Sequence, residues 1–169
     1  WPGEKGRKRE VRVWSNCDEV QLYLNGKEVS GSGGVWKTNY VPGELKAVGK
    51  LGNQTVQHTI QTPGKATALQ LMADDDHLAA DGFDALPLTV TVIDDSGNAV
   101  PIDGKTVAFS IVGPARLVGI GGETTAKTAE GQAVILVQST GAPGTVRVAA
   151  RCADLPNIPQ SELVIKTTK

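Results

Sequence analysis

Polar and apolar residues alternate along most of this chain, and a period of two leaves few folds open to it. In the segment 87–94, for example, Leu88, Val90 and Val92 take every second position, and threonine residues stand between them. Successive side chains of a β-strand point to opposite faces, so this pattern is typical of a strand with one buried face. No stretch of a dozen residues has the spacing of an amphipathic helix. We therefore expect an all-β protein.

The alternating segments are short, and turn sequences separate them. Asn25-Gly26 and Pro42-Gly43 are typical of tight turns beside antiparallel strands. Short strands at this spacing are typical of antiparallel β-sandwiches of the immunoglobulin type. The strands that we expect are 9–15, 19–25, 35–40, 44–51, 54–62, 66–73, 87–94, 105–112, 115–120, 132–139, 144–151 and 161–167.

A break in the alternation at 62–65 indicates a domain boundary. This Thr-Pro-Gly-Lys segment ends one strand with a turn pair, and a new alternating run begins at Ala66. We expect two consecutive immunoglobulin-like antiparallel β-sandwich domains, a small module over 1–62 and a C-terminal domain over 66–169. The small module can bury little apolar surface by itself, so contact with a neighbour would stabilise it.

The charge of the chain is nearly balanced, with 17 basic and 18 acidic residues and a formal net charge of −1. Nucleic acids and anionic membranes attract a basic surface, so we expect neither as a partner. The basic cluster 5–9 is interpreted as a solvated flank. No apolar run reaches the ~18 residues of a membrane span. The chain does not begin with Met, and we expect it to be a piece of a longer protein.

Many hydrolases use a pair of carboxylates for catalysis, but the acidic residues of this chain lie in the expected turns. The runs 74–76 and 94–95 fall between strands, where aspartate side chains bind nearby backbone N–H groups. The histidines are isolated, with His58 on what we take as an inner face and His77 in the acidic turn. No serine or cysteine stands in a nucleophile motif. We expect no catalytic residue in this chain.

A calcium site in the acidic segment 74–84 is an alternative use of these residues, because several carboxylate oxygens lie there beside backbone carbonyls. The segment lacks the spacing and the terminal glutamate of an EF-hand, so a solvated loop is the preferred interpretation. Cys17 and Cys152 fall in different segments without metal-ligand spacing. We expect two unpaired thiols, no metal ion and no cofactor.

Aromatic side chains are candidates for contact with a sugar or with another domain, because each ring offers a flat apolar surface. The three tryptophans all lie in the N-terminal segment. We expect Trp36 to face the core, since Lys37 beside it takes the opposite face of the strand. Trp14 is expected within a strand and partly exposed. The candidate sugar or domain contacts are Trp14, Tyr23 and Trp1.

Several runs of the N-terminal segment agree with one known family in both residues and spacing: WPG at 1–3, VRVWSNCDEV at 11–20, LYLNGK at 22–27 and YVPGELKAV at 40–48. Together they resemble the immunoglobulin-like module that follows the catalytic barrel in family 2 glycoside hydrolases of the β-galactosidase type. The resemblance covers essentially all of 1–62. In such a module these residues build strands and turns.

The second segment is similar to the last domain of the same enzymes through AADGFD at 79–84, VTVID at 90–94, GNAVP at 97–101, VAFS at 107–110 and GPARLVGIG at 113–121. After Gly121 the sequence departs from the turn and longer loop that are common in the family. The runs 128–133 and 144–148 also resemble bacterial immunoglobulin-like repeats of adhesins.

The resemblance implies a non-catalytic C-terminal region of a family 2 glycoside hydrolase, a β-galactosidase in the first instance. The nucleophile and the acid of that family are glutamates of the upstream barrel, so no catalytic residue is carried over to this chain. The implied partner is the catalytic barrel of the parent enzyme, and the implied location is the periplasm or the outside of a bacterial cell. A carbohydrate-binding module and adhesin repeats are the alternatives.

Overall fold

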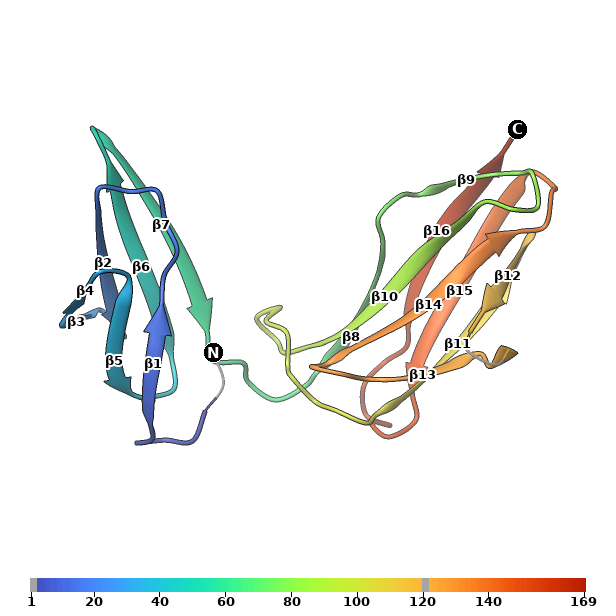
Figure 1. Ribbon diagram of the computed structural model, residues 1–169. Helices are drawn as coiled ribbons and strands as arrows, with labels where there is room; N and C mark the ends of the chain where they lie inside the picture. Colours follow the sequence, from blue (N-terminus) through green and yellow to red (C-terminus); the bar gives the residue numbers. More distant parts are fainter. Residues whose placement is uncertain (1–2, 120–121) are drawn as a thin grey trace. The chain divides into compact units, whose positions relative to one another are not determined.

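The computed structural model describes residues 3–119 and 122–169 of the chain (Figure 1). These residues form β-strands and no α-helix, so the all-β prediction is confirmed. None of them belongs to a helix with the length and apolar character that crossing a membrane requires. The chain divides into two compact units, Trp1–Pro63 and Gly64–Lys169. Each unit is an immunoglobulin-like β-sandwich built mainly from antiparallel strands.

The first unit consists of two sheets. Its strands are β1 (Lys8–Arg12), β2 (Glu19–Leu24), β3 (Lys27–Val29), β4 (Gly31–Ser32), β5 (Val35–Asn39), β6 (Glu44–Leu51) and β7 (Gln54–Gln61). One sheet has the order β3-β2-β6-β7 and the other has the order β1-β5-β4. All pairs in both sheets are antiparallel.

The turn between β2 and β3 has the conformation that its sequence predicts. Asn25 and Gly26 have φ angles of 51° and 76°, a left-handed region that asparagine tolerates and glycine enters without strain. The Asn25 amide also ties this turn to the start of β6. Its Oδ1 accepts a hydrogen bond from the Glu44 N–H at 2.8 Å, and its Nδ2 donates one to the Pro42 carbonyl at 3.0 Å. These residues therefore build the sheet.

The core of the first unit is small. Its buried cluster consists of Leu22, Trp36 and Leu45, and Trp36 is only 2% exposed, which confirms its predicted inward orientation. Gly31 of β4 lies directly against the indole, where an added Cβ would collide with the ring. The indole thus fills the space between the two sheets, as large aromatic side chains commonly do.

The second unit also consists of two sheets. Its strands are β8 (Ala68–Ala73), β9 (His77–Ala79), β10 (Ala85–Ile93), β11 (Thr106–Val112), β12 (Ala115–Val118), β13 (Thr125–Lys127), β14 (Gln132–Ser139), β15 (Gly144–Cys152) and β16 (Ser161–Thr168). The sheet orders are β12-β14-β10-β8 and β13-β11-β15-β16-β9. The pair of β16 with β9 is parallel, whereas the other pairs of these sheets are antiparallel.

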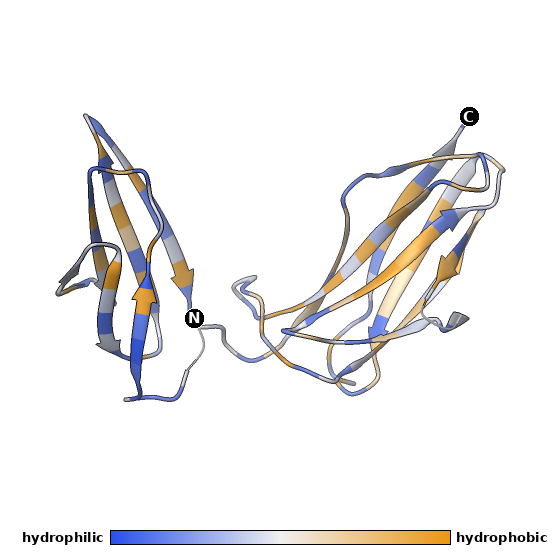
Figure 2. Cartoon of the chain, viewed as in Figure 1, coloured by the Kyte–Doolittle hydropathy of each residue, from blue (hydrophilic) through white to orange (hydrophobic). Residues whose placement is uncertain are grey.

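The core of the second unit is larger and follows the predicted alternation. Leu88, Val90 and Val92 of β10 are completely buried, and Val107 of β11 and Val148 of β15 join the same cluster from the other sheet. Figure 2 shows hydrophilic and hydrophobic residues alternating along the strands. Each sheet therefore turns one apolar face toward the other.

The structure differs from the expected strands in a few places. The expected strand 9–15 ends at Arg12 in β1, and Trp14 follows in a loop, where the Ser15 hydroxyl accepts a hydrogen bond from the Cys17 N–H at 3.1 Å. The expected strand 115–120 ends at Val118 in β12, and its last residue lies outside the described residues. The alternation of polar and apolar residues does not reveal β3, β4, β9 and β13, because each has too few residues to show a period of two.

Candidate functional site

Aspartate side chains hold the turns and loops of this protein, as the sequence predicts. The carboxylate of Asp84 accepts a hydrogen bond from the Ala79 N–H at 2.7 Å. Oδ1 of Asp81 accepts bonds from the N–H groups of Phe83 and Asp84, each at 2.8 Å. Further backbone N–H groups donate to the carboxylates of Asp18, Asp75, Asp94, Asp103 and Asp154. These carboxylates therefore have structural roles.

Two of these carboxyl groups have lowered pKa values. Asp94 is 4% exposed and accepts hydrogen bonds from the N–H groups of Gly64 at 2.7 Å and Asn98 at 2.8 Å. These donors, above all the Gly64 N–H, lower the pKa of Asp94 from the usual 3.8 to about 2. The N–H of Asp84 is the first cause of a lowered pKa at Asp81. A catalytic acid needs a raised pKa to keep its proton near neutral pH, so neither group suits that role.

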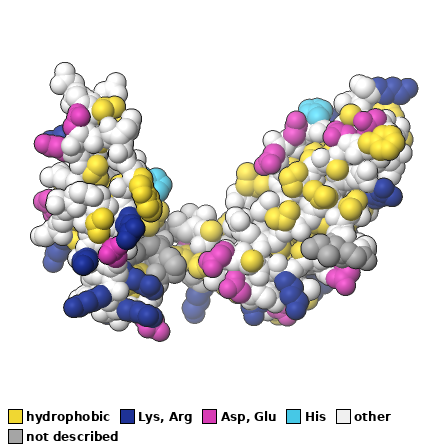
Figure 3. Space-filling view, viewed as in Figure 1, with side chains coloured by type: hydrophobic (Ala, Val, Ile, Leu, Met, Phe, Trp, Pro, Cys, Tyr) yellow, Lys and Arg dark blue, Asp and Glu magenta, His cyan; other side chains and the backbone are white. Residues whose placement is uncertain are grey.

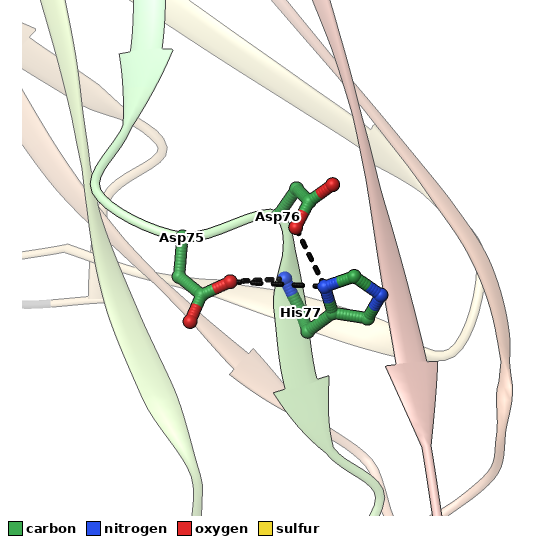
Figure 4. A group of neighbouring side chains, drawn as sticks. All are labelled: Asp75, Asp76 and His77. Atoms are coloured by element: carbon green, nitrogen blue, oxygen red, sulfur yellow. Dashed lines mark hydrogen bonds and ion pairs between the residues drawn. The ribbon is translucent and has the colours of Figure 1, made fainter.

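A cluster of possible metal ligands lies at the start of β9 (Figure 4). Nδ1 of His77 lies 2.6 Å from Oδ1 of Asp76 and 3.7 Å from Oδ1 of Asp75. The same Asp75 oxygen accepts a hydrogen bond from the His77 N–H, and all three residues are exposed. Calcium takes oxygen ligands, about 6–8 of them, and the imidazole of His77 is a nitrogen donor that does not fit such a set. One hydrogen bond and two close contacts of the His77 ring with carboxylate oxygens hold these three residues together.

β7 is exposed on both faces, although one of them belongs to the inside of the sandwich. Strand pairing places Ile60 beside Leu45 and His58 beside Ala47, on the side of β6 that packs into the core. Ile60 and Val56 nevertheless keep 41% and 50% of their surfaces exposed, and His58 is exposed as well. The sequence thus predicts the correct face for His58 but the wrong burial. In the part of the chain that the structure describes, the β1-β5-β4 sheet does not bury this face.

The aromatic candidates differ in their surroundings. Trp14 is 86% exposed, far more than expected, because it lies in the loop after β1 and not within the strand. Tyr23 of β2 is half-buried, and its hydroxyl donates a hydrogen bond to Oε1 of Gln21 at 3.0 Å. Nζ of Lys46 lies 5.9 Å from the centre of the Tyr23 ring, over the surface on which a sugar would stack. Trp1 lies outside the described residues.

Trp14 borders a pocket of ≈ 350 Å³ that Cys17 and Asp18 also line. Cys17 lies over Gly49 of β6, where an added Cβ would stand 2.6 Å from the Cys17 Sγ and 3.4 Å from a methyl carbon of Val56. Glycine is therefore required at this position for Cys17 to approach the sheet. Cys17 thus lies near Val56 of β7 and also lines the pocket that Trp14 borders.

The second unit carries apolar side chains on the outer face of its β12-β14-β10-β8 sheet. Strand pairing places Val134 beside Thr89 and Thr89 beside Met72. Met72, Val134 and Leu136 are exposed to 55%, 53% and 42%, and Figure 3 shows hydrophobic side chains gathered over β10 and β14. The alternation of polar and apolar residues does not predict this surface. The signal that identifies it is the uninterrupted apolar run 133–137, which places apolar side chains on both faces of β14.

Both units match known sequence families. Residues 69–158 match the glycoside hydrolase family 2 C-terminal domain 5, and residues 6–57 match a domain of unknown function, DUF4982. The β-galactosidase of Thermoanaerobacter pseudethanolicus is 29% identical over 166 residues, which cover 84% of this chain and 22% of that protein. A β-glucuronidase of Formosa agariphila is 35% identical over 127 residues, which cover 68% of this chain and 13% of that protein.

A solved structure has the same fold over the whole chain. It is a glycosyl hydrolase family 2 member from Bacteroides cellulosilyticus, with a TM-score of 0.87 and 29% sequence identity. The match covers 100% of this chain and 24% of that one. The present chain thus spans less than a quarter of the length of the β-galactosidase and of this crystallised enzyme.

Proposed function

Since the chain belongs to glycoside hydrolase family 2, as a C-terminal region of such enzymes, we propose that it braces the catalytic barrel of a β-galactosidase-like parent or extends the surface of that barrel. The observation that carries the proposal is the match of 69–158 to the C-terminal domain 5 of the family. The role of the chain itself is accessory and non-catalytic. The parent's activity and partners are our proposals.

The chemistry of the carboxylates supports an accessory role. Glycoside hydrolysis needs an acid with a raised pKa and a second carboxylate about 5–10 Å away. Here the aspartates bind backbone N–H groups in turns, and the pKa values of Asp81 and Asp94 are lowered. Such groups stay ionised and hold loops in place. We therefore assign proton transfer and nucleophilic attack to the upstream barrel of the parent.

The parent's substrate is proposed from its relatives. A β-galactosidase matches more of this chain than the β-glucuronidase does, 84% against 68%, so we propose a β-galactoside first and a β-glucuronide second. We also propose that the parent is a bacterial enzyme of the periplasm or the cell exterior. Carbohydrate is a second candidate partner of the chain itself, because the exposed ring of Trp14 is available for stacking.

Expression of the complete gene beside this chain alone tests the proposal. We expect the complete protein to hydrolyse nitrophenyl β-galactoside or nitrophenyl β-glucuronide, and we expect no turnover by the chain alone after repurification. Removal of residues 1–169 from the complete protein should shorten the half-life of its activity on heating. Turnover by the repurified chain contradicts the accessory role. A complete protein that is inactive on both substrates contradicts the proposed parent.

A further inference from the structure

The uncovered side of β7 carries large apolar side chains that the other side of the strand lacks. Val56, His58 and Ile60 point to the core side of the sheet, whereas the alternate residues Gln57 and Thr59 point to the outer side. Both sides are exposed in this chain, yet only the core side carries large apolar side chains, those of Val56 and Ile60, which alternate with Gln54 and His58. Apolar residues on one side of a strand and polar residues on the other give no advantage when solvent covers both sides, because an exposed apolar face adds no stability and promotes association. The pattern indicates that something covers this side.

The reason for the exposure lies in the second sheet of the unit. Contacts between the two sheets include those of β4 with β2 and of β5 with β3. These strands lie toward the β3 edge of the larger sheet, and β7 forms its opposite edge. The sandwich is therefore closed on one side and open on the other. Covering the open side would extend the core beyond Leu22, Trp36 and Leu45.

The open side continues beyond β7 to the end of the sandwich. Cys17 lies next to Val56 over Gly49, and Trp14 borders the same pocket as Cys17. We call Trp14, Cys17, Val56, His58 and Ile60 the open face. None of these five side chains is an acidic residue, a lysine or an arginine. Asp18, which lines the same pocket as Trp14 and Cys17, accepts a hydrogen bond from the Gly52 N–H, so a partner that covers this surface leaves no carboxylate without a donor.

We propose that the open face is the surface on which the catalytic region of the parent enzyme docks. This inference rests on the proposed function. The matched β-galactosidase has most of its length outside the aligned segment, so ample polypeptide of the same chain is available as a partner. A unit with so small a buried cluster needs further apolar burial to be stable. A partner on the same polypeptide is always present, which makes a permanently apolar face tolerable.

Chemical labelling of His58 provides a direct test. Diethyl pyrocarbonate modifies exposed imidazole, and peptide mapping by mass spectrometry reports on this residue alone. We expect His58 to react about tenfold more slowly in the complete enzyme than in the 169-residue chain, with free N-acetylhistidine in each sample as the reactivity standard. Equal rates in the two proteins overturn the inference.

A pair of matched substitutions provides the second test. Ile60→Lys places a charge on the open face, and Gln57→Lys places the same charge on the outer face of the same strand. In the complete enzyme I60K should shorten the half-life of thermal inactivation at least about tenfold, as expected for a lysine forced into an apolar contact, whereas Q57K should leave it nearly unchanged. In the chain alone the two variants should melt at similar temperatures. Equal effects of I60K and Q57K in the complete enzyme overturn the inference.

Other occupants of the open face give different results. Protection of His58 in the chain alone that increases with protein concentration indicates a second copy and overturns the inference. Protection of His58 in the chain alone by galacto-oligosaccharide indicates a sugar site and also overturns it. If the parent enzyme is active and its His58 reacts as fast as in the chain alone, the docking inference is wrong and the accessory role still stands. If the complete protein hydrolyses neither glycoside, the proposed activity of the parent is wrong, and the labelling of His58 still shows whether the open face is covered.

Discussion

In β10 of the second unit, the inward-facing residues from Leu86 to Val92 are all buried, whereas in β7 of the first unit the inward-facing Val56 and Ile60 are half exposed. Both strands alternate polar and apolar residues. What differs is the opposite sheet. In the second unit it has five strands, and in the first it has three, of which β4 contributes only Gly31–Ser32. Period-two patterning thus identifies the apolar face of a strand, and the neighbouring sheet determines whether that face is buried.

The comparison implies different tolerances to the loss of one core side chain. The first unit depends on a few buried groups around Trp36, and the second distributes its burial over a much larger cluster. A small domain has a free energy of unfolding of only about 5 kcal/mol, near the lower end of the range for native proteins. A single large core deletion therefore removes most of the stability of the first unit and only a part of that of the second.

The largest effect is expected for Trp36→Ala. Loss of a buried aromatic ring costs about 3–5 kcal/mol, which is comparable to the whole stability of a small unit. We expect the first unit of W36A to unfold and the second to stay folded. A two-dimensional ¹H–¹⁵N NMR spectrum should lose the dispersed signals of 3–63 and keep those of 64–169. A fully dispersed W36A spectrum would show that the small cluster is not what holds the first unit together.

Leu88→Ala is the matching change in the second unit. Leu88 is completely buried, and its truncation should cost about 2–5 kcal/mol. The second unit should nevertheless remain folded at 25 °C, with a lower melting temperature, because its other core contacts remain. Differential scanning calorimetry of L88A measures this decrease. If L88A unfolds the second unit while W36A leaves the first folded, the comparison is reversed.

Acid should weaken the second unit through Asp94. Its folded-state pKa of about 2 lies below the usual 3.8, so the ionised group stabilises the fold above pH 4 or so, and this contribution disappears as the pH falls toward about 2. We expect Asp94→Asn to melt at a lower temperature at neutral pH, because a neutral amide replaces the carboxylate acceptor of the Gly64 and Asn98 N–H groups. The acid-induced decrease should be smaller in D94N.

Melting temperatures of the wild-type and D94N proteins at a series of pH values test this assignment. The decrease of the wild-type value below about pH 4 should exceed that of D94N. Parallel pH curves for the two proteins would assign the acid sensitivity to other carboxylates.

The smallest effect is expected for Trp14→Ala. The indole is 86% exposed, and changes at exposed positions usually alter stability by less than about 0.5 kcal/mol. W14A should therefore melt close to the wild type and serve as the control for W36A. We also expect galacto-oligosaccharide to leave wild-type tryptophan fluorescence unchanged. Saturable quenching that disappears in W14A would instead identify Trp14 as part of a sugar-binding surface.

Much of the fold follows from sequence-local rules. The long strands could be predicted because each shows a period of two over five or more residues, and the Asn25-Gly26 turn because its positive φ angles suit these two residues. The structural role of the aspartates was predictable for the same reason, since Asp81 and Asp84 bind N–H groups only a few positions away. The resemblance to family 2 glycoside hydrolases also rests on short runs of sequence.

Other properties depend on segments that are distant in the sequence. Asp94 reaches its low pKa through the N–H of Gly64, thirty positions earlier in the chain. The end of β1 before Trp14 leaves an indole in solvent that the pattern assigns to a strand.

The order of residues alone shows which side of β7 carries Val56 and Ile60, because side chains alternate along any strand. The exposure of Val56, His58 and Ile60 on that side follows instead from the packing of the two sheets, because burial depends on how far the β1-β5-β4 sheet extends across its partner.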